Sequence, residues 1–256
     1  MSSLTAVSVS KEFPGHGPGD PAVLALKDVS FTVKDDEFCS ILGHSGCGKT
    51  TMLNLIAAFE QPTAGQIFVD GKPVTRPGWR RSMIFQDYAL FHWLTIEDNI
   101  AFGLEMKSVP RAERGRIVAD YISLVGLKGF ENRYPHQLSG GMRQRVSIAR
   151  ALAVNPDILL MDEPFAALDA QNRQLMQMET ARILATTQKT VMLVTHSIEE
   201  AIILSDRIVV MTRRPGTVKA NIEVKLPRPR NEDDPQFIAL KKQIRALIQD
   251  EFEIET

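Results

Sequence analysis

Residues 43–50 read Gly-His-Ser-Gly-Cys-Gly-Lys-Thr and directly follow the apolar run Phe-Cys-Ser-Ile-Leu at residues 38–42. A Gly-x-x-x-x-Gly-Lys-Ser/Thr pattern between a strand and a helix forms a loop whose backbone N–H groups hold phosphates. We therefore predict nucleotide binding, with Lys49 at the β and γ phosphates and Thr50 at Mg²⁺. The residues assigned to the nucleotide in this phosphate loop and the position after it are Gly43, His44, Ser45, Gly46, Cys47, Gly48, Lys49, Thr50 and Thr51.

Two further motifs follow along the chain. Residues 138–145 read Leu-Ser-Gly-Gly-Met-Arg-Gln-Arg, and residues 158–163 read Ile-Leu-Leu-Met-Asp-Glu. The first is a second Gly-rich helix start, which offers another set of backbone N–H donors for phosphates. In the second, Asp162 ends a buried strand and is placed to hold Mg²⁺, while Glu163 is placed to polarise a water. The phosphate loop and this acidic motif together predict hydrolysis of the nucleotide and not binding alone.

The composition narrows the class of protein. The 256 residues are 44% hydrophobic, and 30 Lys and Arg face 31 Asp and Glu, for a net charge of −1. Such a balance provides no global field that would draw the chain onto nucleic acid. Cys39 and Cys47 are too few for a disulfide framework, which fits a reducing cytoplasm. No apolar run approaches the ~18 residues that span a bilayer, so we expect any membrane attachment to come through a partner.

The hydrophobic pattern predicts an α/β fold with an antiparallel layer. Residues 38–42, 158–161, 191–194 and 208–211 are short continuous apolar runs, as in parallel strands covered on both faces. Near the N-terminus, Val7 and Val9 alternate with polar residues, as do Val29, Phe31 and Val33, which predicts half-buried strands. Asp70-Gly71 predicts a hairpin turn after residues 66–69.

A helical insertion follows. Thr95-x-x-Asp98 is a helix start signal, and Ile117, Tyr121 and Val125 lie on one helical face before Gly126. We place a helical subdomain at about residues 87–152, inside an ATPase domain of residues 1–230.

Residues 231–256 form a predicted helical tail. Asp234-Pro235 opens a helix there, and its apolar face carries Phe237, Leu240, Ile244 and Leu247. The sequence leaves open whether this helix packs on the catalytic core or binds a partner.

With these motifs in place, the chain from about Phe13 to His196 resembles the ATP-binding subunits of ABC transporters. The resemblance implies a P-loop NTPase fold of the ABC type, with ATP and Mg²⁺ as cofactors. It also implies the roles of individual residues. The catalytic residues are Glu163, His196 and Gln86; the metal site takes Thr50, Gln86 and Asp162; further nucleotide contacts come from Phe13, Ser139, Gly140, Gly141 and Asp169.

In the family, the signature residues (Ser139, Gly140 and Gly141 here) contact the γ phosphate held by the other subunit of a pair. Gln86 matches the glutamine that senses Mg²⁺ and the lytic water, and His196 matches the switch histidine. Asp169 matches a loop that contacts the second subunit, and Phe13 stands where an aromatic residue stacks on adenine. Taken alone, Gln86 and His196 are ordinary polar residues at strand ends and Phe13 is a core residue, so their joint order carries the assignment.

The departures from the family pattern are modest. Met142 replaces a frequent glutamine, Ala166 a frequent serine, Asp36 a frequent glycine and Phe13 a frequent tyrosine. Among the assigned roles, the departures bear on adenine stacking alone, through Phe13.

Residues 88–94, Tyr-Ala-Leu-Phe-His-Trp-Leu, are unusually aromatic. In the family this region lines a groove that receives a short cytoplasmic helix of the membrane subunit, and Trp and Tyr are favoured at interfaces. The alternative is that Phe91, Trp93 and Leu94 complete the core of the helical subdomain. Residues 88–105 and the tail resemble importer ATPases of the nitrate, sulfonate and taurine group, although His92 replaces a frequent proline. An importer for another small anion or a vitamin precursor stays open.

The resemblance implies a set of partners. We expect a homodimer or a paired ATPase subunit, an integral membrane permease, and an indirect link to a solute-binding protein, with no nucleic acid. The expected place is the cytoplasmic face of the inner membrane, as a peripheral subunit. The alternatives are a soluble ABC ATPase of nucleic-acid repair or translation, which usually has paired domains or large insertions, and an exporter subunit. Residues 212–230 hold six Lys or Arg and one acidic residue, which suits either an anionic lipid surface or a solvated strand and loop.

Overall fold

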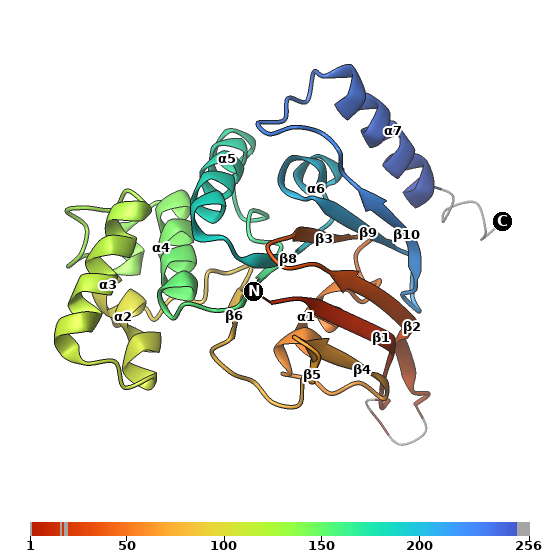
Figure 1. Ribbon diagram of the computed structural model, residues 1–256, viewed down its shortest axis with the longest axis horizontal. Coiled ribbons are helices and arrows are strands. Elements are labelled where there is room, and N and C mark those ends of the chain that lie inside the picture. The colour runs from red at the N-terminus through yellow and green to blue at the C-terminus, as the bar shows by residue number, and fades with distance from the viewer. Residues whose placement is uncertain (1, 16, 18–19, 250–256) are drawn as a thin grey trace. The chain divides into compact units, whose positions relative to one another are not determined.

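The computed structural model describes residues 2–15, 17 and 20–249 (Figure 1). The chain divides into two compact units. The first takes Met1–Pro77 and Thr190–Thr256, and the second takes Gly78–Lys189.

An antiparallel sheet in the first unit has the strand order β2-β1-β4-β5 and confirms the predicted antiparallel layer. Its strands are β1 (Leu4–Phe13), β2 (Val23–Val33), β4 (Ala64–Val69) and β5 (Lys72–Pro73). The turn between the last two is Asp70-Gly71, with φ angles of 52° and 70°, so the predicted hairpin is confirmed. Positive φ at both central residues is what a tight hairpin turn of this kind requires.

Strand β1 departs from the simple alternation that its sequence predicts. Val9 is 0% exposed, whereas Val7 is 46% exposed. The register between β1 and β2 shifts between Ala6 and Val9, and Ser8 there has a φ of 47°. A bulge inserts one extra residue and reverses which face the following side chains occupy. The expectation that Val7 shares a buried face with Val9 is therefore wrong.

The first unit also contains parallel strands, in the order β10-β9-β3-β8. Strand β3 pairs in parallel with β8 on one side and with β9 on the other, and β10 runs antiparallel to β9. Every residue of β3 and β8 is buried, as predicted for strands covered on both faces. The elements are β3 (Phe38–Leu42), β8 (Thr190–Thr195), β9 (Arg207–Met211) and β10 (Val218–Glu223), with helices α1 (Lys49–Ala57), α6 (Ile198–Leu204) and α7 (Pro235–Gln249).

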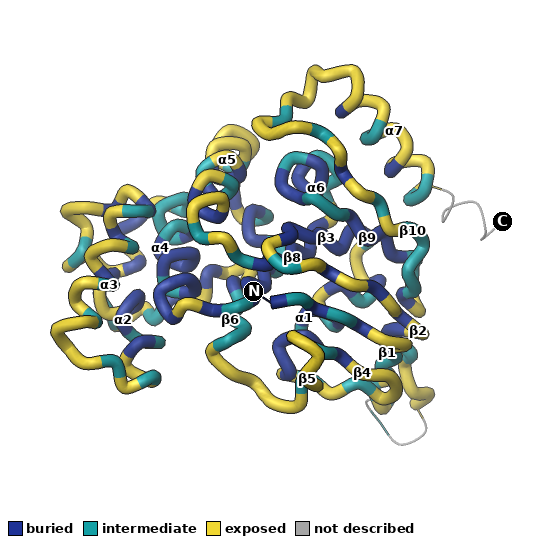
Figure 2. Tube along the Cα trace, in the orientation of Figure 1, coloured by how far each residue is buried: buried dark blue, intermediate teal, exposed yellow. Residues whose placement is uncertain are grey.

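Helix α7 packs on the core of the first unit (Figures 1 and 2). Phe237 and Ile244 are fully buried, and Leu240 and Leu247 pack against the same cluster. That cluster takes further side chains from β3, α6, β9 and the segment after β10: Leu42, Ala201, Ile202, Ile208, Val210 and Val224. Of the two possibilities left open by the sequence, the structure shows packing on the core.

The second unit is mostly helical and takes in the segment at residues 87–152. Thr95 caps the first helix, because its side chain accepts a hydrogen bond from the Asp98 N–H at 3.1 Å, as the start signal predicts. Helices α2, α3 and α4 pack against one another, and strands β6 and β7 pair in parallel. The elements are β6 (Arg81–Ile84), α2 (Ile96–Met106), α3 (Arg111–Leu124), the short 3₁₀ helix η1 (Pro135–Gln137), α4 (Gly140–Ala153), β7 (Ile158–Asp162) and α5 (Ala170–Thr187).

Within residues 2–15, 17 and 20–249, no helix has the length and apolar character needed to cross a bilayer.

Candidate active site

The phosphate loop joins β3 to α1. Gly48 is the N-cap of α1 with a φ of 97°, and Gly46 has a φ of 77°. A Cβ on Gly48 would also lie 2.6 Å from Leu26 Cδ2, so both the backbone and the space require glycine there. The first turn of α1 carries no acidic residue. The positive end of the helix dipole is thus suited to an anion.

Lys49 is buried inside this loop. Its Nζ donates hydrogen bonds to the backbone oxygens of Gly43 and His44, both at 2.9 Å. These bonds hold the loop in a curve around the Lys49 ammonium group. A curved loop of backbone N–H groups with a lysine at its base fits the phosphates of a nucleotide.

His196 lies at the same edge of the sheet as the phosphate loop. Strands β3 and β8 pair so that Leu42 is opposite Thr195. Gly43 and His196 each follow directly, at the carboxyl ends of neighbouring parallel strands. Ligands of α/β proteins bind at that edge. The His196 side chain is exposed there.

A hydrogen-bonded turn fixes the chain around His196. The Thr195 hydroxyl accepts from the Ser197 N–H at 3.0 Å and donates to the buried Glu200 carboxylate. Ser197 in turn caps α6, because its hydroxyl accepts from the Glu200 N–H at 3.2 Å. The position of His196 therefore depends on how α6 is held.

In the second unit, Asp162 is the last residue of β7, and Gln86 lies two residues beyond the end of the neighbouring strand β6. Ile84 of β6 is opposite Met161 of β7, so both side chains lie at the carboxyl edge of this parallel pair. Gln86 is exposed, whereas Asp162 and Glu163 are half-buried. Glu163 has a φ of 43°, which turns the chain sharply away from the strand.

The signature residues form the start of α4. Ser139 is the N-cap, and its hydroxyl accepts from the Met142 N–H at 3.3 Å. A Cβ on Gly140 would lie 3.2 Å from Leu168 Cδ2 and 3.4 Å from the Tyr88 hydroxyl. The helix start is therefore close to two segments, one just after Gln86 and one just before Asp169.

Asp169 caps α5. Its carboxylate accepts hydrogen bonds from Asn172, at 2.7 Å from the side-chain amide and 3.0 Å from the backbone N–H. These bonds hold the pKa of Asp169 below its ordinary value. The carboxylate is thus kept ionised at the start of this helix.

The loop after Gln86 is held by side chains that the sequence did not reveal. Tyr88 and Ala89 both have left-handed backbone conformations, with φ angles of 61° and 48°. The Arg150 guanidinium donates to their carbonyl oxygens, at 3.0 Å to Tyr88 and 2.7 Å to Ala89, and the Ser147 hydroxyl donates to Tyr88 at 3.2 Å. Burial lowers the pKa of Arg150 to about 10. Helix α4 therefore ties the signature residues to this loop.

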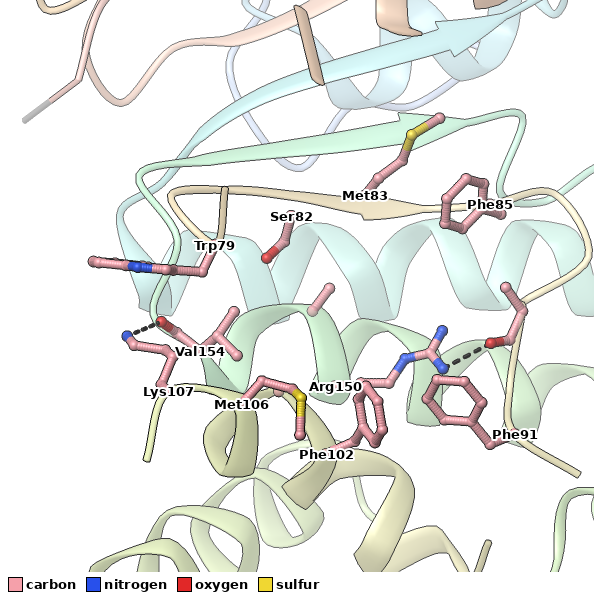
Figure 3. Close-up of a pocket in the computed structure, with 13 residues that line it drawn as sticks. Trp79, Ser82, Met83, Phe85, Phe91, Phe102, Met106, Lys107, Arg150 and Val154 are labelled. Atoms are coloured by element: carbon pink, nitrogen blue, oxygen red, sulfur yellow. Dashed lines mark hydrogen bonds between the residues drawn. The ribbon is translucent and has the colours of Figure 1, made fainter. Parts of the chain in front are cut away.

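A cavity of about 600 Å³ lies beside that loop (Figure 3). We call it the aromatic groove; the residues that line it include Trp79, Phe85, Phe91, Phe102, Met106, Lys107 and Arg150. Two cations lie over aromatic rings in it, with Lys107 3.7 Å from the Trp79 centroid and Arg150 5.4 Å from the Phe91 centroid. The groove is thus apolar with two positive groups at its wall.

Residues of the aromatic stretch 88–94 are divided between the groove wall, the core and the surface, and none of Phe91, Trp93 and Leu94 is fully buried. Phe91 lines the groove and stacks on Phe102 of α2, with centroids 4.5 Å apart. Tyr88 and Leu90 are buried, while Trp93 is 74% exposed and contacts the Phe91 ring. Trp79, Phe102 and Met106 were missed, because residues from two other segments complete the groove.

Phe13 ends β1 and is half-buried. The Lys11 ammonium lies 4.8 Å from its ring centroid and also pairs with Glu60 at 2.8 Å. One face of the ring thus interacts with a cation. Stacking of adenine on this ring stays a prediction.

The basic segment at residues 212–230 is partly structural. The Arg230 guanidinium is buried and donates to the carbonyl oxygens of Ile202 and Ser205, both at 2.6 Å. Burial lowers the pKa of Arg230 to about 10. Arg228 pairs with Asp206 at 2.7 Å. Both arginines therefore form hydrogen bonds or ion pairs within the protein, at the carboxyl end of α6.

Known proteins are similar to this chain over most of its length. The family model described as ABC transporter matches residues 26–166. An uncharacterised ABC transporter ATP-binding protein of Methanocaldococcus jannaschii is 49% identical over 229 residues, covering 90% of this chain and 86% of that protein. The taurine import ATP-binding protein of Pelagibacter ubique is 43% identical over 255 residues, covering 97% and 96%.

A longer relative and a solved structure extend the comparison. The bicarbonate transport ATP-binding protein of Synechococcus elongatus is 45% identical over 252 residues, which is 95% of this chain but 38% of that protein. A solved dimeric ATP-binding cassette in a post-hydrolysis state, bound to ADP and Pi, superposes with a TM-score of 0.73 at 32% identity. It covers 88% of this chain and 100% of its own length.

Proposed function

The chain belongs to the ABC transporter family and is an ATPase, and from this premise we propose that it drives uptake of a small solute through a separate membrane permease. The observation that carries the proposal is the aromatic groove, which lies beside the loop after Gln86 and shares Arg150 with it. A docking surface that shares a side chain with a catalytic loop suits an ATPase that drives movement of a partner protein.

ATP is held by the phosphate loop in this proposal, with Lys49 at the β and γ phosphates and Phe13 at the adenine. Thr50, Gln86 and Asp162 supply oxygen atoms, the donors that Mg²⁺ prefers. When bound, Mg²⁺ neutralises charge on the phosphates. Glu163 accepts the proton of the attacking water as general base, and His196 stabilises the γ phosphate.

The signature residues act on the nucleotide of a second subunit. Ser139 is exposed at the start of α4, where backbone N–H groups are suited to a phosphate. The likeness to a dimeric cassette with ADP and Pi supports this pairing. The pair is either a homodimer or a complex with another ATPase subunit, and Asp169 contributes to the contact.

The aromatic groove receives a short cytoplasmic helix of the permease. Met106 is 69% exposed at its wall, and an amphipathic helix buries its apolar face in such a groove. Lys107 and Arg150 favour acidic or carbonyl groups on that helix. The subunit then lies peripherally at the cytoplasmic face of the inner membrane.

The transported solute is a small anion of the nitrate, sulfonate or taurine kind. Relatives at 43–45% identity are named for import of taurine and nitrate and for transport of bicarbonate. The ATPase contacts the solute only indirectly, through the permease and a solute-binding protein. Selectivity therefore lies in those partners.

Co-purification with the permease tests the proposal, followed by ATPase assays in liposomes with solute-binding proteins loaded with nitrate, taurine, an alkyl sulfonate or bicarbonate. We expect one loaded protein to stimulate hydrolysis, and Lys49→Ala to abolish it through loss of ATP binding. Absence of any membrane partner, together with stimulation by nucleic acid, would instead support a soluble ABC ATPase. Stimulation by an outward-moving substrate alone would support an exporter.

A further inference from the structure

Helix α7 contacts the phosphate loop and the first turn of α6, the helix that follows His196. The Lys241 ammonium pairs with the Glu199 carboxylate of α6 at 2.6 Å. The backbone oxygen of Ile248, near the other end of α7, lies 3.4 Å from His44 Nε2 in the phosphate loop. Glu199 is three residues beyond His196, in the first turn of α6.

The apolar contacts of α7 reach the same two places. Phe237 and Ile244 are buried in one cluster with Leu42, the residue directly before Gly43, and with Ala201 and Ile202 of α6. Figure 2 shows the buried side of α7 turned toward α6. A buried contact of this kind restricts motion more than an exposed one, because interiors are close-packed. Helix α7 therefore fixes α6 relative to the end of β3.

The ion pair between Lys241 and Glu199 is a second, polar contact between α7 and α6. Lys241 and Glu199 are each about one third exposed, so water screens the pair only in part. The Glu199 carboxylate also accepts from the Ser197 hydroxyl at 3.2 Å, and Ser197 is adjacent to His196. Two hydrogen bonds thus connect Lys241 to the residue next to His196.

We propose that Lys241 is a positioning residue for ATP hydrolysis, which acts through Glu199 to hold His196 at the edge of the phosphate loop. The proposal rests on the role given to His196 above. The phosphate loop keeps its own bonds from Lys49 to Gly43 and His44 when this pair is broken. Loss of the pair therefore lowers the rate of hydrolysis and leaves ATP binding nearly unchanged.

Charge reversal tests the pair in the full chain. We expect Lys241→Glu and Glu199→Lys each to lower kcat about three- to tenfold, with the Kd for ATP within about twofold of the parent. The double reversal re-forms the pair and restores at least half of the parent kcat, and Lys241→Arg keeps nearly all of it. Lys242→Glu is the matched control, since it makes the same charge change at an exposed position of the same helix.

A purely structural role gives a different result. If the reversals lower Tm, ATP affinity and kcat together, or if the double reversal restores nothing, Lys241 does not position the site. Unchanged kcat in both single variants also overturns the inference.

Measurements in a His196→Ala variant distinguish failure of this inference from failure of the proposed function. His196→Ala alone is expected to slow hydrolysis, and adding Lys241→Glu to it is expected to cause no further loss, because both changes act through the same side chain. Normal hydrolysis by His196→Ala would refute the role of His196 and with it the route from Lys241. Slow His196→Ala with additive loss from Lys241→Glu would refute only the positioning role.

Discussion

The Arg150 guanidinium donates a hydrogen bond to the backbone oxygen of Ala89 at 2.7 Å, and this bond joins the helix of the signature residues to the loop behind Gln86. The same guanidinium lies over the Phe91 ring in the aromatic groove. One side chain therefore contacts the loop behind Gln86, a proposed catalytic residue, and the proposed docking site. A helix docked in the groove would contact the Arg150 side chain and, through it, affect the loop behind Gln86.

We expect Arg150→Met to lower permease-stimulated ATP hydrolysis about tenfold while the Kd for ATP is unchanged. The substitution removes both hydrogen bonds from Arg150 to this loop, while the Tyr88 carbonyl oxygen keeps its bond from the Ser147 hydroxyl, so the loop behind Gln86 is held less firmly. Stimulated and basal rates in liposomes measure the effect. Arg116→Met, at an exposed position of α3, is the control. Full stimulation of a folded Arg150→Met variant would contradict this coupling.

Met106→Glu should weaken binding to the permease at least tenfold without lowering Tm. Met106 is 69% exposed on the wall of the groove, so a carboxylate is tolerated by the free subunit but has to be desolvated when an apolar helix docks. Affinity for detergent-solubilised permease measures the effect. Met178→Glu on α5 is matched in chemistry, being 61% exposed and outside the groove lining. Equal loss in both variants would remove the groove from the interface.

The strands and helix starts were predictable because their causes are local. Apolar runs such as residues 38–42 and the Thr95 capping signal each act within a few residues of their own position. The phosphate loop was predictable for the same reason, because Gly46 and Gly48 have positive φ angles, which glycine adopts more readily than other residues. The roles of Gln86 and His196 depended on family resemblance, because neither residue has a distinctive local pattern.

The rest of the site depends on contacts between segments far apart in sequence. Arg150 bonds to Ala89 across 61 residues, and Lys241 pairs with Glu199 across the whole of β9 and β10. Nothing in the spacing of these residues indicates that they meet. The bulge at Ser8 is a similar case, because one left-handed residue reversed the exposure expected for Val7.

Ser139→Arg is expected to spare ATP binding and to block hydrolysis in a homodimer. A bulky side chain at the start of α4 obstructs a phosphate brought there by the second subunit. The substitution also removes the N-cap bond to Met142, worth about 1 kcal/mol, so Ser139→Ala serves as the control for that loss alone. Mixing Ser139→Arg with Lys49→Ala should restore activity through one intact composite site. A mixture no more active than its parts would argue against sites shared across a dimer.

The Lys241 and Glu199 pair should stabilise the fold in a pH-dependent way. Although burial acts to raise it, the hydrogen bond from Lys241 brings the pKa of Glu199 below its ordinary value. A depressed carboxyl pKa gives stability that is present above the unfolded pKa of about 4.3 and is lost as pH falls through the folded value. Because both groups are partly exposed, the contribution is at most about 1 kcal/mol. Chemical denaturation of the parent and of Lys241→Met at pH 7 and pH 3 measures it. A difference that persists at pH 3 would assign the effect to packing.

Glu163→Gln should keep ATP and Mg²⁺ binding and reduce turnover by about 10²- to 10⁴-fold, the range for loss of a general base. The amide has the shape of the carboxylate but does not accept a proton from water. Glu163 also has a φ of 43°, so a slow variant has to be shown to be folded. Gln has no branch at Cβ and differs from Glu only at the end of the side chain, so we expect Tm within about 2 °C of the parent.

The same variant tests the dimer mechanism. If the γ phosphate is held between the phosphate loop of one subunit and Ser139, Gly140 and Gly141 of the other, blocked hydrolysis preserves the closed state. Glu163→Gln should then elute as a dimer with ATP and as a monomer without it in size-exclusion chromatography. Near-normal turnover would remove the role of Glu163 as general base. Slow turnover without ATP-dependent dimerisation would keep that role and refute closure of two subunits around shared ATP.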